Sequence, residues 1–320
     1  MPDVIKKISV LMPAYNSGRY ITAAVKSILN QTFTDFEFII IDDGSTDDTE
    51  SIIKGFKDNR IIYRKIEHSG TSAALNYGIG LCRHEWIARI DADDINIPQR
   101  LEKQVRYLES NQGIDILSSW SVYFKDPAKI LFLLNEPLNH DEIHKYLDLH
   151  NPLNQSAMIC RKSIFEKYKF NETLNSNEDY ELLYRLRDEY TMGNMPGYLV
   201  YTRLREDSRT AEGRRDNLYD MLNTNAFRKM VDSKSKGDHF YWASVTAWLN
   251  YFYGSRQSAR GYFRNSFSLK NLTAYFTTFL PDKYFFKFIN SHFKYRLKSF
   301  LKNKSFYKKE LTSLLDQAGK

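Results

Sequence analysis

Apolar residues in the first 120 positions alternate between two arrangements, short continuous runs and sets with helical spacing. The runs are rich in Val, Ile and Phe and end at turn residues, which is typical of buried strands. Between the runs, apolar residues recur every three or four positions, which indicates helices. We predict strands at 8–12, 36–41, 61–66, 85–90 and 114–118, and helices at 19–30, 47–56, 71–81 and 98–109.

Strands that alternate with helices predict an α/β fold with a doubly wound, mostly parallel sheet flanked by helices. After residue 120 the alternation weakens. There the sequence predicts a helix at 141–147, a strand at 156–160, a helix at 178–189, a strand at 198–204 and a helix at 214–232. We expect one α/β domain over residues 1–230 and a C-terminal α-helical extension over residues 231–320.

Three polar loops follow the predicted strands. They are Pro13-Ala14-Tyr15-Asn16, Asp42-Asp43-Gly44-Ser45 and Asp91-Ala92-Asp93-Asp94. In open α/β sheets ligands bind beyond the carboxyl ends of the strands, so we expect the three loops to meet in one crevice.

The third loop carries three carboxylates within four residues, directly after a buried strand. Alternate carboxylates can bind Mg²⁺ or Mn²⁺ and leave coordination positions for phosphate oxygens. The alternative is a solvated acidic turn, in which Asp94 caps the helix that follows. Asp42 and Asp43 also have two interpretations, because they can hydrogen-bond a nucleobase imide or ribose, or serve only as helix caps. Gly78 and Gly80 lie inside a predicted helix and are not a dinucleotide fingerprint.

These motifs, in this order and together with Asn177-Glu178-Asp179, resemble the family 2 glycosyltransferases. The resemblance covers residues 7–215. It implies the GT-A fold, a nucleotide-diphospho-sugar donor for which the resemblance favours UDP, a divalent metal, and inversion at the anomeric carbon. The chain lacks the Gln-x-x-Arg-Trp motif of processive synthases, which favours the addition of a single sugar.

By this resemblance, the residues of the first two loops bind the nucleoside: Pro13, Ala14, Tyr15, Asn16, Asp42 and Asp43. Asp91 faces the ribose or sugar and also contacts the metal, for which Asp93 is the main ligand. Asp179, with Glu178 beside it, matches the catalytic base. Arg203 and Arg205 match a stretch that contacts the diphosphate. Ser72 stands where some members carry a basic residue near the nucleotide.

The chemistry supports these roles independently of the family. An inverting transfer needs one base to take the proton of the acceptor hydroxyl, while a cation or arginines neutralise the departing diphosphate. Asp179 suits the first task and Asp93 the second. The alternative for Glu178 and Asp179 is a structural pair at a helix start, stabilised by the helix dipole.

Two other functions remain open at this point. A sugar-phosphate nucleotidyltransferase also binds nucleotides with carboxylates and Mg²⁺, but it typically has a Gly-rich, basic loop after the first strand, and the stretch 13–19 holds one glycine. A non-catalytic nucleotide-sugar-binding scaffold predicts a damaged metal or base site. Both sites are intact in the sequence.

Charge divides the chain unevenly. The net charge is +7, yet residues 231–320 hold 16 Lys/Arg against 5 Asp/Glu, which leaves 30 against 34 in residues 1–230. The two cysteines, Cys82 and Cys160, are too few for a disulfide framework and favour a reducing compartment. We expect neither a secretory signal nor a transmembrane segment, and hence a cytoplasmic protein.

The basic charge gathers in residues 283–309, which hold nine Lys/Arg, no acidic residue and many aromatics. Such a segment is typical of a helix that lies in an anionic membrane interface. A helix docked on its own domain with a solvated basic face is the alternative. We do not expect nucleic acid as a partner, because the rest of the chain is acidic.

The extension also bears on partners. A tetratricopeptide-like hairpin around residues 258–263 would have to pack on the domain or on a second chain, which allows a homo-oligomer. Similar bacterial transferases extend lipid-linked oligosaccharides. The expected acceptor is therefore a glycan, lipid-linked, at the inner face of the cytoplasmic membrane, in cell-surface polysaccharide synthesis.

Overall fold

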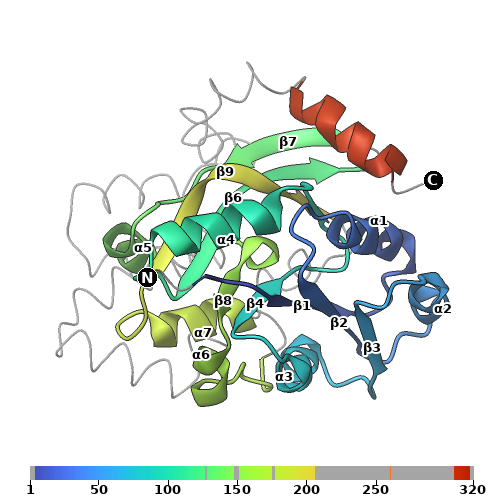
Figure 1. The fold of residues 1–320 in the computed structure, drawn as a ribbon, viewed down its shortest axis with the longest axis horizontal. Coiled ribbons are helices and arrows are strands. Elements are labelled where there is room, and N and C mark those ends of the chain that lie inside the picture. Colours follow the sequence, from blue (N-terminus) through green and yellow to red (C-terminus); the bar gives the residue numbers. More distant parts are fainter. Residues whose placement is uncertain are drawn as a thin grey trace.

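The structure, a computed structural model, describes residues 4–126, 128–147, 151–174, 177–205, 260 and 306–317. Its strands join in one sheet with the order β3-β2-β1-β4-β8-β6-β9-β5, and β7 pairs with β6 outside this path. The predicted helices at 214–232 and in most of the extension lie outside the described residues. Figure 1 shows the sheet running through the molecule with helices on either side.

The first half of the sheet is parallel. Its strands are β1 (Ile8–Ala14), β2 (Phe36–Asp42), β3 (Ile61–Lys65) and β4 (Trp86–Arg89), and its helices are α1 (Gly18–Leu29), α2 (Thr49–Gly55) and α3 (Thr71–Leu81). β1 lies between β2 and β4, and Ala14 pairs with Asp42 in register. This register places the ends of β1 and β2, and the loops that follow them, side by side.

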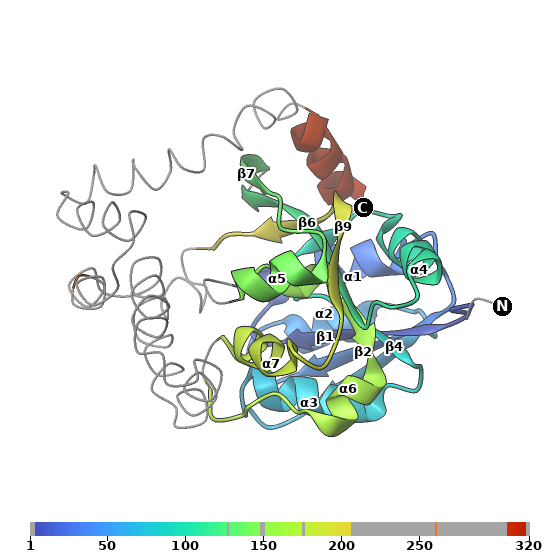
Figure 2. The same ribbon diagram turned by 90° about the vertical axis from the view of Figure 1, so that its left-hand side faces the viewer.

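Alternate side chains of these strands enter two cores. Val10 and Met12 of β1 pack with α1 and with α4 (Arg100–Ser110) on one face. Leu11 packs with α3 on the other face. Figure 2 shows α1 and α4 on one side of the strands, and α3 on the other side with α6 (Lys162–Lys167) and α7 (Glu178–Leu186). The predicted doubly wound arrangement is therefore confirmed.

Glycine is required where α3 crosses the sheet. A Cβ on Gly78 would lie 2.4 Å from Leu11 Cδ1 and 2.9 Å from Ile41 Cγ1. Only a glycine lets the helix approach β1 and β2 this closely. Gly78 is thus a packing residue inside a helix, the element in which the sequence predicted it.

The second half of the sheet is mixed. It contains β5 (Ile95–Asn96), β6 (Ile116–Lys125), β7 (Lys129–Leu134), β8 (Ile159–Arg161) and β9 (Met192–Arg203), together with α5 (His140–Tyr146) and a 3₁₀ turn at Gln155–Ala157. β6 and β9 are parallel, whereas β8 runs antiparallel to both β4 and β6. The predicted strand at 156–160 therefore begins as a turn and becomes a strand only at its end.

Residues 306–317 form a helix that packs on this second half, drawn in red beside β7 and β9 in Figures 1 and 2. Leu311 is fully buried in the core formed with Phe124, Val200 and Tyr201. Tyr307 stacks edge-on against Tyr198. The last residues of the predicted membrane segment, 306–309, therefore belong to a helix docked on the domain.

Candidate active site

The loops after β1 and β2 are bound to each other. The Asp43 N–H donates to Ala14 O at 2.8 Å, and Asn16 N–H donates to Ser45 Oγ at 2.9 Å. Asn16 Oδ1 accepts from Thr46 N–H at 2.9 Å, and Asn16 has a φ of 45°. Asn tolerates this left-handed conformation better than most residues. The structure thus assigns Asn16 a clear task, which is to join the two loops.

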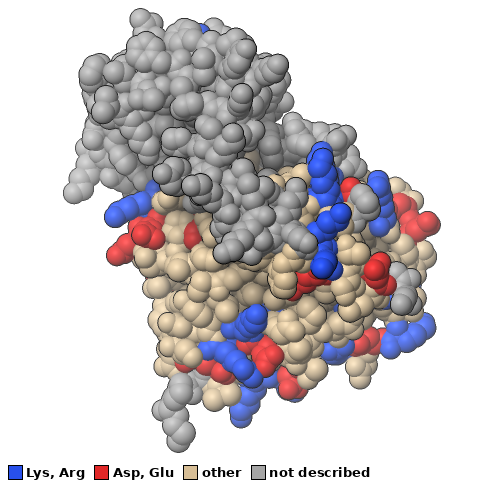
Figure 3. Space-filling model, turned by 90° about the horizontal axis from the view of Figure 1, so that it is seen from above, with Lys and Arg blue, Asp and Glu red and all other residues tan. Residues whose placement is uncertain are grey.

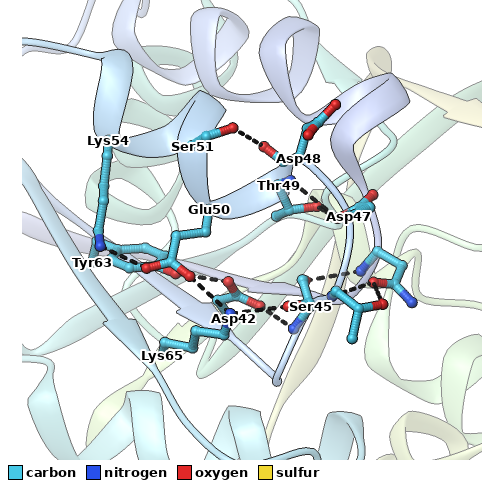
Figure 4. A network of polar contacts seen from close by, with 12 residues as sticks. Asp42, Ser45, Asp47, Asp48, Thr49, Glu50, Ser51, Lys54, Tyr63 and Lys65 are labelled. Atoms are coloured by element: carbon cyan, nitrogen blue, oxygen red, sulfur yellow. Dashed lines mark hydrogen bonds and ion pairs between the residues drawn. The ribbon is translucent and has the colours of Figure 1, made fainter.

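Asp42 is fully buried beneath the second loop. Its Oδ1 accepts from Ser45 N–H at 2.8 Å and its Oδ2 from Tyr63 O–H at 2.7 Å. Figure 4 shows this contact beside the Lys65–Glu50 ion pair, whose lysine also donates to Ser45 O at 2.9 Å. Burial and the hydrogen bond to Asp42 raise the pKa of Tyr63. Asp42 therefore shapes the loop from below.

Asp43 turns toward the loop after β3. Its Oδ1 accepts from Ser69 N–H at 2.8 Å, and its Oδ2 accepts from Gly70 N–H at 3.0 Å and lies 2.9 Å from His68 Nδ1. The His68 ring stacks on Tyr15, with 4.1 Å between ring centroids and 16° between planes. Tyr15, Asp43 and His68 thus form one aromatic and acidic surface.

Asp91 is held from two sides. Arg89 Nη2 donates to its Oδ1 at 2.9 Å, and Ser156 Oγ donates to its Oδ2 at 3.0 Å. Arg89, 5% exposed, also donates to Gln155 Oε1 at 2.8 Å. These contacts fix the carboxylate while 38% of the side chain stays exposed to solvent. Asp91 is therefore rigid and accessible, as a ligand-binding carboxylate should be.

Asp93 lies next to Arg203, the last residue of β9, and Arg205, which follows the strand. Arg205 Nε forms an ion pair with Asp93 Oδ2 at 3.2 Å, and Arg203 Nε donates to the Asp93 carbonyl at 2.9 Å. Burial, and next to it the charge of Asp91, raise the pKa of Asp93. Two carboxylates that repel each other in this way favour a bound cation.

Asp94 has a different task from the one expected. It accepts from the Arg203 N–H at 2.8 Å, whereas α4 begins after Gln99 and receives no side-chain cap from Asp94. The prediction that Asp94 caps the following helix is wrong, because the short strand β5 comes between them. Burial and its two neighbouring aspartates raise the pKa of Asp94. Asp94 fastens β9 to the acidic loop.

Arg203 is largely engaged by the protein. Its side chain is 3% exposed and forms an ion pair with Asp126. Its guanidinium lies 4.7 Å from the ring centroid of Tyr20 and 4.5 Å from that of Phe124. Arg205 lies 5.3 Å from the same Tyr20 ring, and its side chain is 22% exposed. Of the two predicted diphosphate contacts, Arg205 is the more accessible.

Asp179 lies in the first turn of α7, beside Glu178. Asn151 Nδ2 donates to its Oδ2 at 2.9 Å, and an apolar cavity lined by Met158, Ile164 and Leu182 among others borders it. Burial, and next to it the charge of Glu178, raise the pKa of Asp179 to about 6. Arg89 opposes this shift and Asp91 adds to it. Asp179 therefore lies within electrostatic reach of the acidic loop.

A metal at this site would need ligands from a substrate. Among the described residues, no group of three or more His, Cys, Asp or Glu side chains is arranged to hold a metal ion. Asp91 and Asp93 supply carboxylate oxygens, the ligands that Mg²⁺ and Mn²⁺ prefer. Such ions commonly bind through one or two carboxylates plus substrate phosphates. The residues present fit that mode of binding.

Several residues of the site carry no sequence motif. Arg89, Gln155 and Ser156 hold Asp91, Asn151 holds Asp179, and His68 covers Tyr15. Of these residues, only Arg89 could have been found from the sequence, because a charged residue inside an apolar strand needs a buried partner. The others come from loops whose neighbours are fixed by the tertiary fold. Ser72 Oγ is buried without a hydrogen-bond partner among the described residues.

The fold is an α/β sheet whose acidic loops gather at the carboxyl ends of its parallel strands. The family described as Glycosyl transferase family 2 matches residues 9–169, half of the chain. The chain belongs to this family and is a glycosyltransferase. This membership favours glycosyl transfer over the nucleotidyltransferase alternative.

Individual relatives agree with this assignment. An uncharacterized glycosyltransferase of Methanocaldococcus jannaschii is 35% identical over 204 residues, which are 62% of this chain and 70% of that protein. The O-antigen biosynthesis glycosyltransferase WbnJ of Escherichia coli is 32% identical over 191 residues, 58% of this chain and 74% of WbnJ. The S. aureus protein TarS, solved with UDP-GlcNAc, covers 85% of this chain and 90% of its own at a TM-score of 0.55 and 19% identity. The GT-A type of the fold is therefore confirmed.

Proposed function

We propose that the protein transfers a sugar, with inversion and with the help of Mn²⁺ or Mg²⁺, from a UDP-sugar to a hydroxyl of a glycan acceptor. One observation carries the proposal. Asp179, a carboxylate with its pKa raised to about 6, lies within electrostatic reach of Asp91 in the acidic loop. A base and a cation-binding loop thus share one edge of the sheet, which is what an inverting transfer requires.

The donor is proposed to lie across the three loops. Tyr15 offers an exposed ring for stacking, and Asp43 a carboxylate that can accept from a nucleobase imide. Asn16 joins the first two loops and Asp42 holds the second through Ser45 N–H, while Pro13 and Ala14 are the last residues of β1. UDP is proposed because TarS, which shares the fold, was solved with UDP-GlcNAc.

In the transfer, the acceptor oxygen forms a bond to the anomeric carbon as the bond from that carbon to the diphosphate oxygen breaks. Asp179 takes the proton of the acceptor hydroxyl, and Asn151 holds the carboxylate in place. The diphosphate leaves with the electron pair of the broken bond. Arg205 neutralises part of its charge, and a cation bound by Asp93 and Asp91 would supply the rest.

The acceptor is proposed to be a lipid-linked oligosaccharide at the cytoplasmic membrane. The support is the similarity to WbnJ, an O-antigen biosynthesis enzyme, and the basic, aromatic segment 283–309. No helix among the described residues has the length and apolar character to cross a membrane. On the face shown in Figure 3, basic and acidic side chains of the described residues lie intermixed.

The test is a panel of nucleotide-sugars assayed for release of nucleoside diphosphate, with Mn²⁺, Mg²⁺ or EDTA. We expect one UDP-sugar to turn over and EDTA to abolish the reaction. Asp93→Ala and Asp179→Asn should each lower kcat/KM by roughly 10²-fold or more, the size expected for lost charge stabilisation or a lost base. Glu166→Gln, an exposed carboxyl on α6, is the matched control.

The outcome also decides between catalysis and a binding scaffold. A scaffold would bind UDP-sugars without releasing UDP in the presence of any acceptor extract. Turnover that persists in EDTA, or that survives both substitutions, would contradict the mechanism proposed here. The stereochemistry is checked by NMR of the anomeric proton in the product.

A further inference from the structure

We propose that the His68 side chain occupies the nucleobase subsite in the ligand-free protein, and that a nucleotide-sugar binds by displacing it. The inference rests on the proposed function, because it takes Tyr15 and Asp43 as the nucleobase contacts. His68 thereby competes with the base for its site and sets the affinity for the nucleotide.

The hydrogen bonds of Asp43 give the first reason. Its carboxylate accepts from the backbone N–H groups of Ser69 and Gly70, at 2.8 and 3.0 Å, and from His68 Nδ1 at 2.9 Å. The Asp43 side chain is only 4% exposed, so a ligand reaches it by replacing a partner that can move. The backbone donors belong to the turn before α3. The His68 side chain is 55% exposed and can leave by rotating about its own bonds.

The stacking geometry gives the second reason. The ring centroids of Tyr15 and His68 are 4.1 Å apart and the planes differ by 16°. A base inserted between them would need roughly twice that separation, since each aromatic pair requires a stacking distance of its own. The base therefore takes the place of the imidazole on Tyr15. His68 makes both contacts proposed for a pyrimidine, a stacked face and an N–H donated to Asp43.

The backbone of His68 is held in place, whereas its exposed side chain can rotate. Gly44 has a φ of 73°, and a Cβ there would lie 2.8 Å from the His68 backbone nitrogen. The loops that carry Gly44 and His68 are thus in close contact, and the contact admits only glycine. The His68 side chain accordingly leaves the base site by rotating, without movement of the loop.

An internal competitor lowers apparent affinity by the fraction of molecules in which it occupies the site. Removing it should therefore tighten nucleotide binding. We expect His68→Ala to lower the Kd for UDP, measured by calorimetry on the full chain with Mn²⁺, by about threefold to tenfold. His84→Ala is the matched control, because His84 donates its backbone N–H to Ser9 Oγ at 3.2 Å and the substitution retains this contact. Its Kd should equal that of the wild type.

A weaker or an unchanged Kd for His68→Ala would overturn the proposal. Weaker binding would show that His68 is a stacking contact for the bound base. If the wild-type protein binds neither UDP nor any nucleotide-sugar of the panel, the proposed function itself fails, and this inference with it. Normal wild-type binding combined with an unchanged variant defeats the inference alone.

A second measurement works on the wild-type protein. Stacking on Tyr15 shifts the imidazole proton signals of His68 upfield, and their assignment follows from their loss in His68→Asn. Saturation with UDP should move them to the positions of an unstacked histidine. Signals that stay upfield at saturation would show that His68 remains on Tyr15, which contradicts displacement.

Discussion

Asp179 is subject to two opposing influences. Its place in the first turn of α7 favours the ionised form through the helix dipole, which contributes about 0.3–1 kcal/mol at an ordinary site. The charge of Arg89 and a backbone hydrogen bond favour the ionised form too. Burial beside the apolar cavity and the charge of Glu178 oppose ionisation and prevail, since the pKa rises to about 6. A base with this pKa is ionised at neutral pH and still a useful proton acceptor.

This environment makes the rate depend on pH in a defined direction. The base acts in its ionised form, so kcat/KM should fall as pH drops through about 6, the value to which the pKa of Asp179 is raised. A pH profile of the best donor and acceptor checks this. An acid limb near the ordinary aspartate value of 3.8 would contradict it.

The same carboxyl should reduce stability at neutral pH. An acid whose folded pKa lies above its unfolded value binds more protons when folded, so the stability it contributes below pH 3.8 is lost as pH rises through about 6. Asp179→Asn removes this loss. We expect its free energy of unfolding to exceed that of the wild type by on the order of 1 kcal/mol at pH 8 and to be similar at pH 4. Thermal unfolding at the two pH values measures this. Glu166→Gln, an exposed control, should show no such difference between the two pH values.

Arg89 connects the donor and acceptor sides of the site. It donates to Asp91 and Gln155, and its charge lowers the pKa of Asp179. Arg89→Met should therefore move the acid limb of kcat/KM to higher pH and lower kcat, by roughly 10-fold or more, because Asp91 loses its orientation. Arg106→Met, on an arginine with 75% of its side chain exposed, is the control. A lower kcat with an unmoved acid limb would leave Arg89 only a supporting role.

Among the elements, those with local signals were predicted and those that depend on distant pairing were not. The helix at 71–81 has the expected bounds, because its apolar spacing lies within the segment itself. β5 is only two residues long and exists because Ile95 pairs with Tyr201, far along the chain. β9 extends through Pro196 and Gly197, which ordinarily end a strand, because β6 pairs with it on both sides of a bulge at these two residues.

The helix at 306–317 should support the acidic loop through β9. Its Leu311 packs on Tyr201 of β9. Arg203, two residues after Tyr201 in the same strand, contacts both Asp93 and Asp94. Leu311→Asp would bury a carboxylate without a partner, which costs several kcal/mol, so the helix should undock. We expect faster amide hydrogen exchange in 306–317 and in β9, and a higher Mn²⁺ requirement. Ser313→Asp, on the exposed face of the same helix, should change neither.

At the scale of the whole molecule, the position of the site follows from topology. Parallel strands bring the ends of β1, β2 and β4 to one edge, and this much was predictable because the three loops follow recognisable strands. The contacts of His68, Asn151 and Gln155 were not, because each comes from a segment remote in sequence: His68 and Asn151 reach the carboxylates of Asp43 and Asp179, and Gln155 accepts from Arg89. The sequence thus locates the carboxylates, and the fold determines which of them are held, buried or left accessible.

We expect the basic segment 283–309 to bind anionic membranes. Removing residues 283–320 would also remove the docked helix at 306–317, so a deletion cannot separate membrane binding from stability. A variant that neutralises six basic residues outside that helix keeps the helix. In this variant Gln replaces Lys283, Lys287, Lys294, Arg296, Lys298 and Lys302. At ~1 kcal/mol for each basic residue near an anionic surface, affinity for phosphatidylglycerol vesicles should fall by more than about 100-fold. Vesicle flotation at low salt measures this.

A control variant separates the segment from the overall charge. It neutralises six exposed basic residues of the α/β domain, namely Lys6, Lys7, Lys57, Lys103, Arg106 and Lys169. Both variants lose the same charge, so general electrostatic attraction would weaken both equally. A surface formed by the segment predicts loss of vesicle binding only in the first variant, together with loss of activity on a lipid-linked acceptor but not on a soluble one. Equal binding by both variants would mean that the segment does not contact the membrane.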